Sequence, residues 1–128
     1  MSSKLWIFEE QTDLRTLLSY LLQRKGFDVS CFQSLAEASE ALERVQTNSK
    51  MLGPEFVIVG FECVAGTTEE WMRKVRAKFS AARVVCICSD SGDRVAMRLK
   101  ANGILSFERP TSLAQVLELL RSSIGNIE

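Results

Sequence analysis

Charged side chains follow several short apolar runs of this 128-residue sequence. Glu9 and Glu10 come directly after the run at residues 5–8, and Arg109 comes shortly after the run at 104–107. Two adjacent carboxylates can gather a hard cation such as Mg²⁺, which prefers oxygen ligands. An arginine is always charged and can hold a carboxylate through two parallel hydrogen bonds. These residue types therefore predict a cation site or an ion pair, provided that the fold brings the ends of the runs together.

Histidine is absent from the sequence, and this absence limits the chemistry further. It excludes a histidine phosphotransfer protein, a Ser–His hydrolase and a His-ligated metalloenzyme. No pair of nucleophile and general base can be assembled from the remaining residues. The protein is therefore predicted not to be an enzyme.

The four cysteines, at positions 31, 63, 86 and 88, form no recognisable metal-binding or redox motif. No pair has C-x-x-C spacing, and no histidine completes a zinc site. Cys86 and Cys88 would share one face of a strand, an arrangement that suits a disulfide poorly. We expect the cysteines to act as small buried hydrophobic residues.

The composition is that of an ordinary globular domain, with 46% hydrophobic and 25% charged residues. Sixteen basic and sixteen acidic residues cancel, so no bulk charge attracts nucleic acid or an anionic membrane. No run of about 18 apolar residues exists that would span a bilayer, and the first residues lack the form of a signal peptide. We expect one cytoplasmic domain over residues 1–128, with its core at about 4–122.

Apolar runs with strand character alternate with stripes of helical spacing along the chain. Strands are predicted at residues 5–8, 27–32, 56–59, 84–88 and 104–107. Helices are predicted at 14–25, 34–45 and 68–79, around 95–99, and from 112 to about 120. Strict alternation indicates a parallel sheet with helices on both faces, and ligands of such sheets collect at the carboxyl ends of the strands. Here these ends are residues 8–11, 60–66, 88–91 and 108–110.

Local signals support several of these boundaries. Gly26 is expected to end the first helix, because glycine adopts the left-handed conformation common after helix ends. Ser34 with Glu37 forms a capping box at the start of the second helix. Trp6 and Trp71 are expected to pack in the core.

With the strand ends aligned, the chain resembles the receiver domain of two-component response regulators from about residue 4 to 120. Residues 5–15 look like the family's first strand, acidic pair and first helix. Residues 54–61 resemble its third strand, which ends on the phospho-accepting aspartate, and 98–110 resemble the stretch that ends in a Lys–Pro pair. The resemblance implies an α/β, flavodoxin-like (CheY-like) three-layer sandwich. Its five-stranded parallel sheet would have the order 2-1-3-4-5, with five helices.

The family's phosphorylation pocket departs from its usual residues in this chain. The resemblance assigns that pocket to Glu9, Glu10, Gly60, Cys88 or Ser89, and Arg109, with the aromatic switch position at Ser106. A working receiver carries the phosphoryl group on an aspartate, whereas Gly60 has no carboxylate to form an acyl phosphate. The hydroxyl position falls on Cys88, or on Ser89 if the register slips by one. Because the third carboxylate is missing, Mg²⁺ binding by Glu9 and Glu10 is not expected, and no cofactor is predicted.

Arg109 offers a structural compensation for the lost pocket. It replaces the family's lysine and is longer, while Gly60 leaves space beside it. We expect Arg109 to cross the pocket to Glu9 or Glu10, so that an internal ion pair replaces metal and phosphate. The alternative is three surface charges without a fixed contact.

The resemblance implies a phosphorylation-independent receiver that acts through a protein partner or a second copy of itself. In the family, dimerisation and docking use the fourth helix, fifth strand and fifth helix. The charged residues on this face are Arg94, Arg98, Lys100, Glu118 and Arg121. The domain is expected to bind neither a membrane nor, directly, a nucleic acid. A DNA-binding output domain elsewhere in a longer regulator is left open. The basic cluster Arg73, Lys74 and Arg76 is interpreted as a solvated helix face.

Two rival functions remain open at this stage. The first is a phosphorelay receiver with a non-standard acceptor, such as Glu62 or Asp90 near the same rim. The second is a small-ligand-binding domain of flavodoxin-like shape. The second would need a loop that cradles phosphate, and the sequence contains none.

Overall fold

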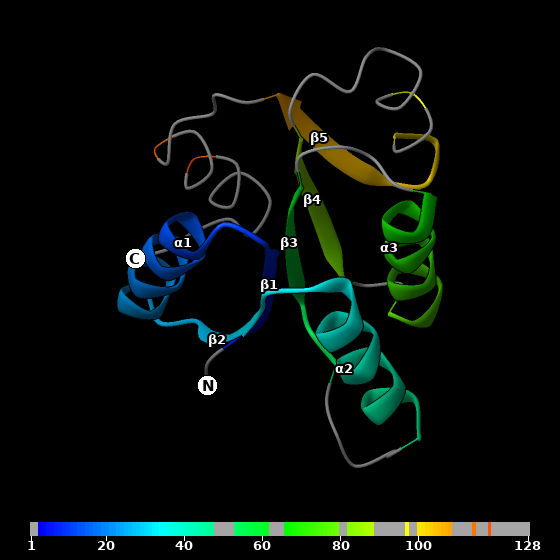
Figure 1. The fold of residues 1–128 in the computed structure, drawn as a ribbon, viewed down its shortest axis with the longest axis horizontal. Helices are drawn as coiled ribbons and strands as arrows, with labels where there is room; N and C mark the ends of the chain where they lie inside the picture. The colour runs from blue at the N-terminus through cyan, green and yellow to red at the C-terminus, as the bar shows by residue number, and fades with distance from the viewer. Residues whose placement is uncertain are drawn as a thin grey trace.

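The computed structural model describes residues 3–47, 53–61, 66–79, 82–88, 97, 100–108, 114 and 118. The elements in chain order are β1 (Lys4–Glu9), α1 (Thr12–Arg24), β2 (Asp28–Phe32), α2 (Leu35–Thr47), β3 (Phe56–Phe61), α3 (Gly66–Lys78), β4 (Arg83–Cys88) and β5 (Ile104–Glu108). All five strands pair in parallel in one sheet of order β2-β1-β3-β4-β5 (Figure 1). The predicted fold class and strand order are therefore confirmed.

The fourth and fifth predicted helices fall mostly outside the described residues. Residues 97, 100, 101, 114 and 118 are described in these two regions, and each is helical. The third helix begins at Gly66, two residues earlier than the sequence pattern predicted.

Helices cover both faces of the sheet, because side chains alternate between the two faces along each strand. Leu5 and Ile7 of β1 pack in one buried cluster with Leu18 and Leu22 of α1. The residue between them, Trp6, belongs to a second cluster, with side chains from α2 and α3. Figure 1 shows the resulting layers, with α1 on one side of the sheet and α2 and α3 on the other.

The local signals at the helix ends behave as expected. Gly26, two residues beyond the end of α1, has a φ of 99°, which side-chain-bearing residues rarely adopt. The Ser34 hydroxyl accepts a hydrogen bond of 3.2 Å from the backbone N–H of Glu37, at the start of α2. Both features confirm predicted boundaries.

The two tryptophans lie in the core, as predicted. Trp6 is 6% exposed and meets the Phe32 ring edge-to-face, with centroids 5.4 Å apart. Trp71 is 3% exposed, and its indole N–H donates a 3.1 Å hydrogen bond to the carbonyl of Ala38. This bond joins α3 to α2, so it satisfies a buried donor while fixing the spacing of the two helices.

The prediction for the cysteines is correct for Cys86 and wrong for Cys31. Cys86 is fully buried in β4, whereas Cys31 is exposed on β2. β2 is an edge strand that pairs with β1 alone among the described strands, so fewer neighbours cover its side chains. The side chain of Cys88, and Cys63 altogether, lie outside the described residues.

The interpretation of α3 as a solvated charged face also needs correction. Arg73 and Lys74 are exposed, but Arg76 is half-buried and donates to the carbonyls of Ala82 (2.9 Å) and Asn102 (3.5 Å). Arg76 thus ties α3 to the segments that precede β4 and β5. Glu69, in the first turn of the helix, is buried as well.

Gly103 is a sensitive position, because its φ is 75° and a Cβ there would lie 2.8 Å from Nη2 of Arg76. We predict that Gly103→Ala destabilises the fold by more than the roughly 1–2 kcal/mol of a left-handed alanine. The added cost arises because Arg76 must shift away from its carbonyl partners. Urea unfolding monitored by circular dichroism measures the difference.

Gly26→Ala is the matched control, since Gly26 also has a positive φ but no atom lies within 4 Å of its added Cβ. Gly26→Ala should lower the free energy of unfolding only by the roughly 1–2 kcal/mol that a left-handed alanine costs. Equal losses in the two variants would contradict a clamping role for Arg76.

Candidate functional site

The carboxyl ends of the central strands line up at one edge of the sheet. The Cα register pairs Glu9 of β1 with Gly60 of β3, and Gly60 with Ile87 of β4. One step further, Phe61 of β3 pairs with Cys88 of β4. The edge that the sequence pattern marked as the candidate site is therefore formed by adjacent backbones.

Gly60 lies in the middle of this edge. Its backbone is buried, with β1 on one side and β4 on the other. Glycine carries no side chain, so the end of the central strand presents no carboxylate. The acidic residue that the register sets beside it is Glu9.

The Glu9 side chain is 2% exposed, and the chain itself provides a partner for it. Its Oε2 accepts a hydrogen bond of 2.9 Å from the backbone N–H of Gln11. Gln11 is the N-cap residue of α1, and its own side chain makes no capping hydrogen bond. Glu9 thus satisfies a backbone donor beside the helix start, where the helix dipole favours negative charge.

Arg15 secures the same loop from inside α1. Its Nη1 donates to the carbonyl oxygens of Glu9 (2.8 Å) and Glu10 (3.4 Å), and its Nη2 donates to the Thr12 hydroxyl (3.4 Å). No feature of the sequence marks Arg15 for this role. Its main acceptors are backbone carbonyls, which every residue has, so no pattern of side chains marks this contact.

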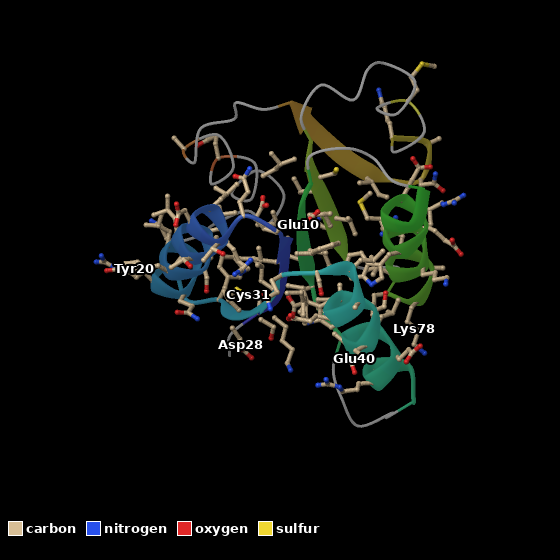
Figure 2. The ribbon with its side chains drawn as sticks, in the orientation of Figure 1. Glu10, Tyr20, Asp28, Cys31, Glu40 and Lys78 are labelled. Carbon is tan, nitrogen blue, oxygen red and sulfur yellow. The ribbon has the colours of Figure 1, made fainter. Side chains whose placement is uncertain are left out.

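The two adjacent glutamates have different environments. Glu9 is buried at the end of β1, whereas Glu10 is exposed where the chain turns toward α1 (Figure 2). Over the described part of the chain, no group of three or more Cys, Asp or Glu residues could hold a metal ion. These donors do not fit Mg²⁺, which demands near-octahedral oxygen coordination. We derive no metal-dependent step, and the absence of Mg²⁺ binding stays a prediction.

Several predicted site residues fall outside the part of the chain that the structure describes. Ser89 and Arg109 lie outside the described residues, as do Glu62 and Asp90. The ion pair of Arg109 with Glu9 or Glu10 therefore stays a prediction. Ser106 lies within β5, and its Cα pairs with that of the buried Cys86.

The predicted interaction face is described at two of its five charged positions. Lys100 and Glu118 are both exposed. Arg94, Arg98 and Arg121 lie outside the described residues. Among the helices that the structure describes, none is both long enough and apolar enough to cross a membrane.

Several response regulators are among the solved structures similar to this one. Chemotaxis protein CheY4 of Vibrio cholerae has a TM-score of 0.74 and 18% identity, over 95% of this chain and 98% of that one. A two-component response regulator from Clostridium difficile has a TM-score of 0.77 and 14% identity, over 96% of both chains. NtrX from Brucella abortus matches 97% of this chain with 26% of its own length, at a TM-score of 0.72 and 14% identity.

No protein-family model matches the sequence, and neither does any curated protein. The structural likeness is therefore one of fold. The chain has the CheY-like, flavodoxin-like fold found in response regulators, with Gly60 as the next-to-last residue of β3.

The Glu9 carboxylate is predicted to stabilise the loop between β1 and α1. Glu9→Ala leaves the Gln11 N–H without its acceptor, and we expect a loss of about 1–3 kcal/mol in the free energy of unfolding. Glu9→Gln keeps an acceptor oxygen and should lose less. Glu10→Ala is the matched control, since this exposed side chain should change stability by within about 0.5 kcal/mol. Equal losses for Glu9→Ala and Glu10→Ala would contradict this role.

Mg²⁺ is predicted to leave thermal stability unchanged. A ligand that binds the native state alone raises the unfolding midpoint, and the midpoint keeps rising with the logarithm of ligand concentration above the Kd. Differential scanning fluorimetry with MgCl₂, against KCl of equal ionic strength, should give the same midpoint. A midpoint that rises with Mg²⁺ concentration above the KCl control would contradict the prediction.

Proposed function

We propose that this protein is an atypical receiver domain that takes part in signal transduction without aspartate phosphorylation. The observation that carries the proposal is Gly60, the next-to-last residue of the central strand, which has no side chain and pairs with the buried Glu9. In this proposal the domain acts through the surfaces it presents to a protein partner or to a second copy.

The chemical argument concerns the nucleophile. Phosphoryl transfer to a receiver makes an acyl phosphate, which requires a carboxylate oxygen that can reach the donor. Gly60 supplies none. Glu9 is a poor substitute, because it is buried and its Oε2 already accepts the Gln11 N–H.

The hydrogen bonds of the loop between β1 and α1 also support the proposal, because they favour one conformation of that loop. In a switching receiver, phosphorylation shifts the balance between two conformations of similar free energy. Here Glu9 and Arg15 hold the loop between β1 and α1 through bonds within the chain. A domain of this kind responds to its binding partners by their differential affinity, or it serves as a fixed docking unit.

The remaining attributes of the proposal follow from the same role. The domain has no enzymatic activity, needs no cofactor and works in the cytoplasm. It is one folding unit and also suits a place in a longer regulator, since NtrX of Brucella abortus devotes 26% of its length to the matching part. The face around Lys100 and Glu118, both exposed, is one candidate for docking.

Acetyl phosphate is predicted to leave the chain unmodified. Incubation with acetyl phosphate and Mg²⁺, followed by intact mass spectrometry, should give the unmodified mass, because no carboxylate stands at position 60. A response regulator with the usual aspartate serves as the positive control in the same reaction.

Stoichiometric addition of one phosphoryl group would overturn the proposal and favour the phosphorelay alternative. Glu62→Gln and Asp90→Asn would then identify the acceptor, since each removes one of the carboxylates that the sequence sets near this rim.

A further inference from the structure

β2 forms an edge of the sheet, since among the described strands it pairs with β1 alone (Figure 1). Asp28, Ser30 and Cys31 of this strand are exposed. An uncovered edge strand presents backbone N–H and C=O groups that can pair with another chain. Proteins commonly protect such edges with lysine or proline, and β2 contains neither. The edge is therefore open to a further strand.

The hydrogen bonds to β1 show which backbone groups of β2 remain for that strand. The N–H of Asp28 donates to the backbone carbonyl just before β1, at 2.9 Å, so the backbone of Asp28 points toward β1. Backbone direction alternates along a strand, so Ser30 and Phe32 point toward β1 as well. Val29 and Cys31 therefore point their N–H and C=O groups away from the sheet. We call these outward groups the β2 edge.

The residues on either side of β2 limit the β2 edge. The N–H of Phe27 donates to the Leu22 carbonyl at 3.1 Å, so it is engaged with the end of α1. Gln33 lies in a bend beyond the strand. A partner strand thus finds its extended hydrogen-bonding groups at Val29 and Cys31.

We infer that β2 of a second copy pairs with the β2 edge in antiparallel orientation, about a two-fold axis at Ser30. Opposite residues of an antiparallel pair exchange both of their hydrogen bonds when their backbones point toward each other. With Ser30 opposite its own copy, Val29 lies opposite Cys31 of the second copy. Every outward donor of either strand then meets an acceptor, and the two sheets become one continuous sheet.

Other antiparallel registers satisfy the β2 edge less well. An axis at Val29 sets Cys31 opposite Phe27 of the second copy, whose N–H is already engaged. An axis at Cys31 sets Val29 opposite Gln33 of the second copy, which lies outside the strand. The axis at Ser30 is therefore the register that uses both outward residues of both copies.

The charges of β2 also suit a second copy as the partner. Asp28 is the one charged residue of the strand. The register at Ser30 sets Asp28 opposite Phe32 of the second copy, so the two carboxylates lie at opposite ends of the paired strands. Like charges directly opposite each other, which destabilise a strand pair, are thus avoided. A two-fold contact uses the same surface on both copies, so the assembly closes at a dimer.

The helix beside the edge leaves room for this approach. α1 packs against both β1 and β2 on one face of the sheet. Two strand spacings of about 4.8 Å separate the α1 helices of the two copies, which places them roughly 10 Å apart. Helices in contact have this separation. Packing of the two α1 helices therefore adds to the hydrogen bonds of the strands.

Cys31→Pro tests the hydrogen bonds by sedimentation velocity over a series of protein concentrations. The wild-type sedimentation coefficient should rise with concentration and level off at the value of a dimer. Cys31→Pro removes an N–H that the single chain does not use, so the fold should persist and the rise should be lost. Cys31→Ser keeps the N–H and is the matched control, which should associate as the wild type does. Circular dichroism checks that both variants are folded.

Cysteine cross-linking tests the register. In the Cys31→Ser chain, Ser30→Cys should form a disulfide-linked dimer on mild oxidation, because residues directly opposite each other at the axis have Cα atoms about 4.5 Å apart. Asp28→Cys in the same chain is the matched control. It is exposed on the same strand, but its copy lies at the far end of the pair, so it should not cross-link. The Cys31→Ser chain alone measures the contribution of the other cysteines.

Several outcomes would overturn the inference. They are a wild type that stays monomeric at every concentration, a Cys31→Pro variant that associates as the wild type does, and cross-linking of Asp28→Cys as strong as that of Ser30→Cys. The inference rests on the proposed interaction role, but none of these results bears on modification by acetyl phosphate. The proposed function and the dimer can therefore fail separately.

Discussion

Parallel pairing of β1 with β3 is the constraint on which the candidate site depends. Its register sets Glu9 beside Gly60, and the pairing of β3 with β4 adds Ile87 to the same row. Helices cover both faces of the sheet, so the strand-end edge and the outer sides of the helices remain for contacts. Gly60 leaves the middle of this row without a reactive side chain, because no neighbouring strand can supply one at the same point.

The buried carboxylate of Glu9 would be unfavourable without polar partners. The chain provides one through the Gln11 N–H, while Arg15 binds the carbonyls of the same loop. Residues that could belong to a reactive site thus contribute to the architecture of the loop. These local hydrogen bonds hold the loop between β1 and α1 in a fold like that of response regulators, beside a strand that carries glycine at position 60.

In the proposed role, signalling relies on the surfaces that the domain presents to other molecules. The apolar groove between α2 and α3 and the exposed side chains of α1 lie on opposite sides of the sheet. The apolar lining of the groove belongs to the buried core, because Leu42 and Trp71 are members of the cluster on that face of the sheet, whereas Leu17 and Tyr20 of α1 are exposed.

The sequence by itself determined the five strands, the first three helices, the parallel sheet, the end of α1 before Gly26 and the start of α2 after Ser34, because these follow from short-range periodicity and backbone preference. Only the tertiary structure decided that Cys31 is exposed and that Arg76 and Arg15 bind carbonyl groups. Burial depends on which strand forms an edge and which helix covers it. Carbonyl acceptors belong to every residue alike. Neither property leaves a pattern in the order of side chains, so it can be known only once distant segments meet.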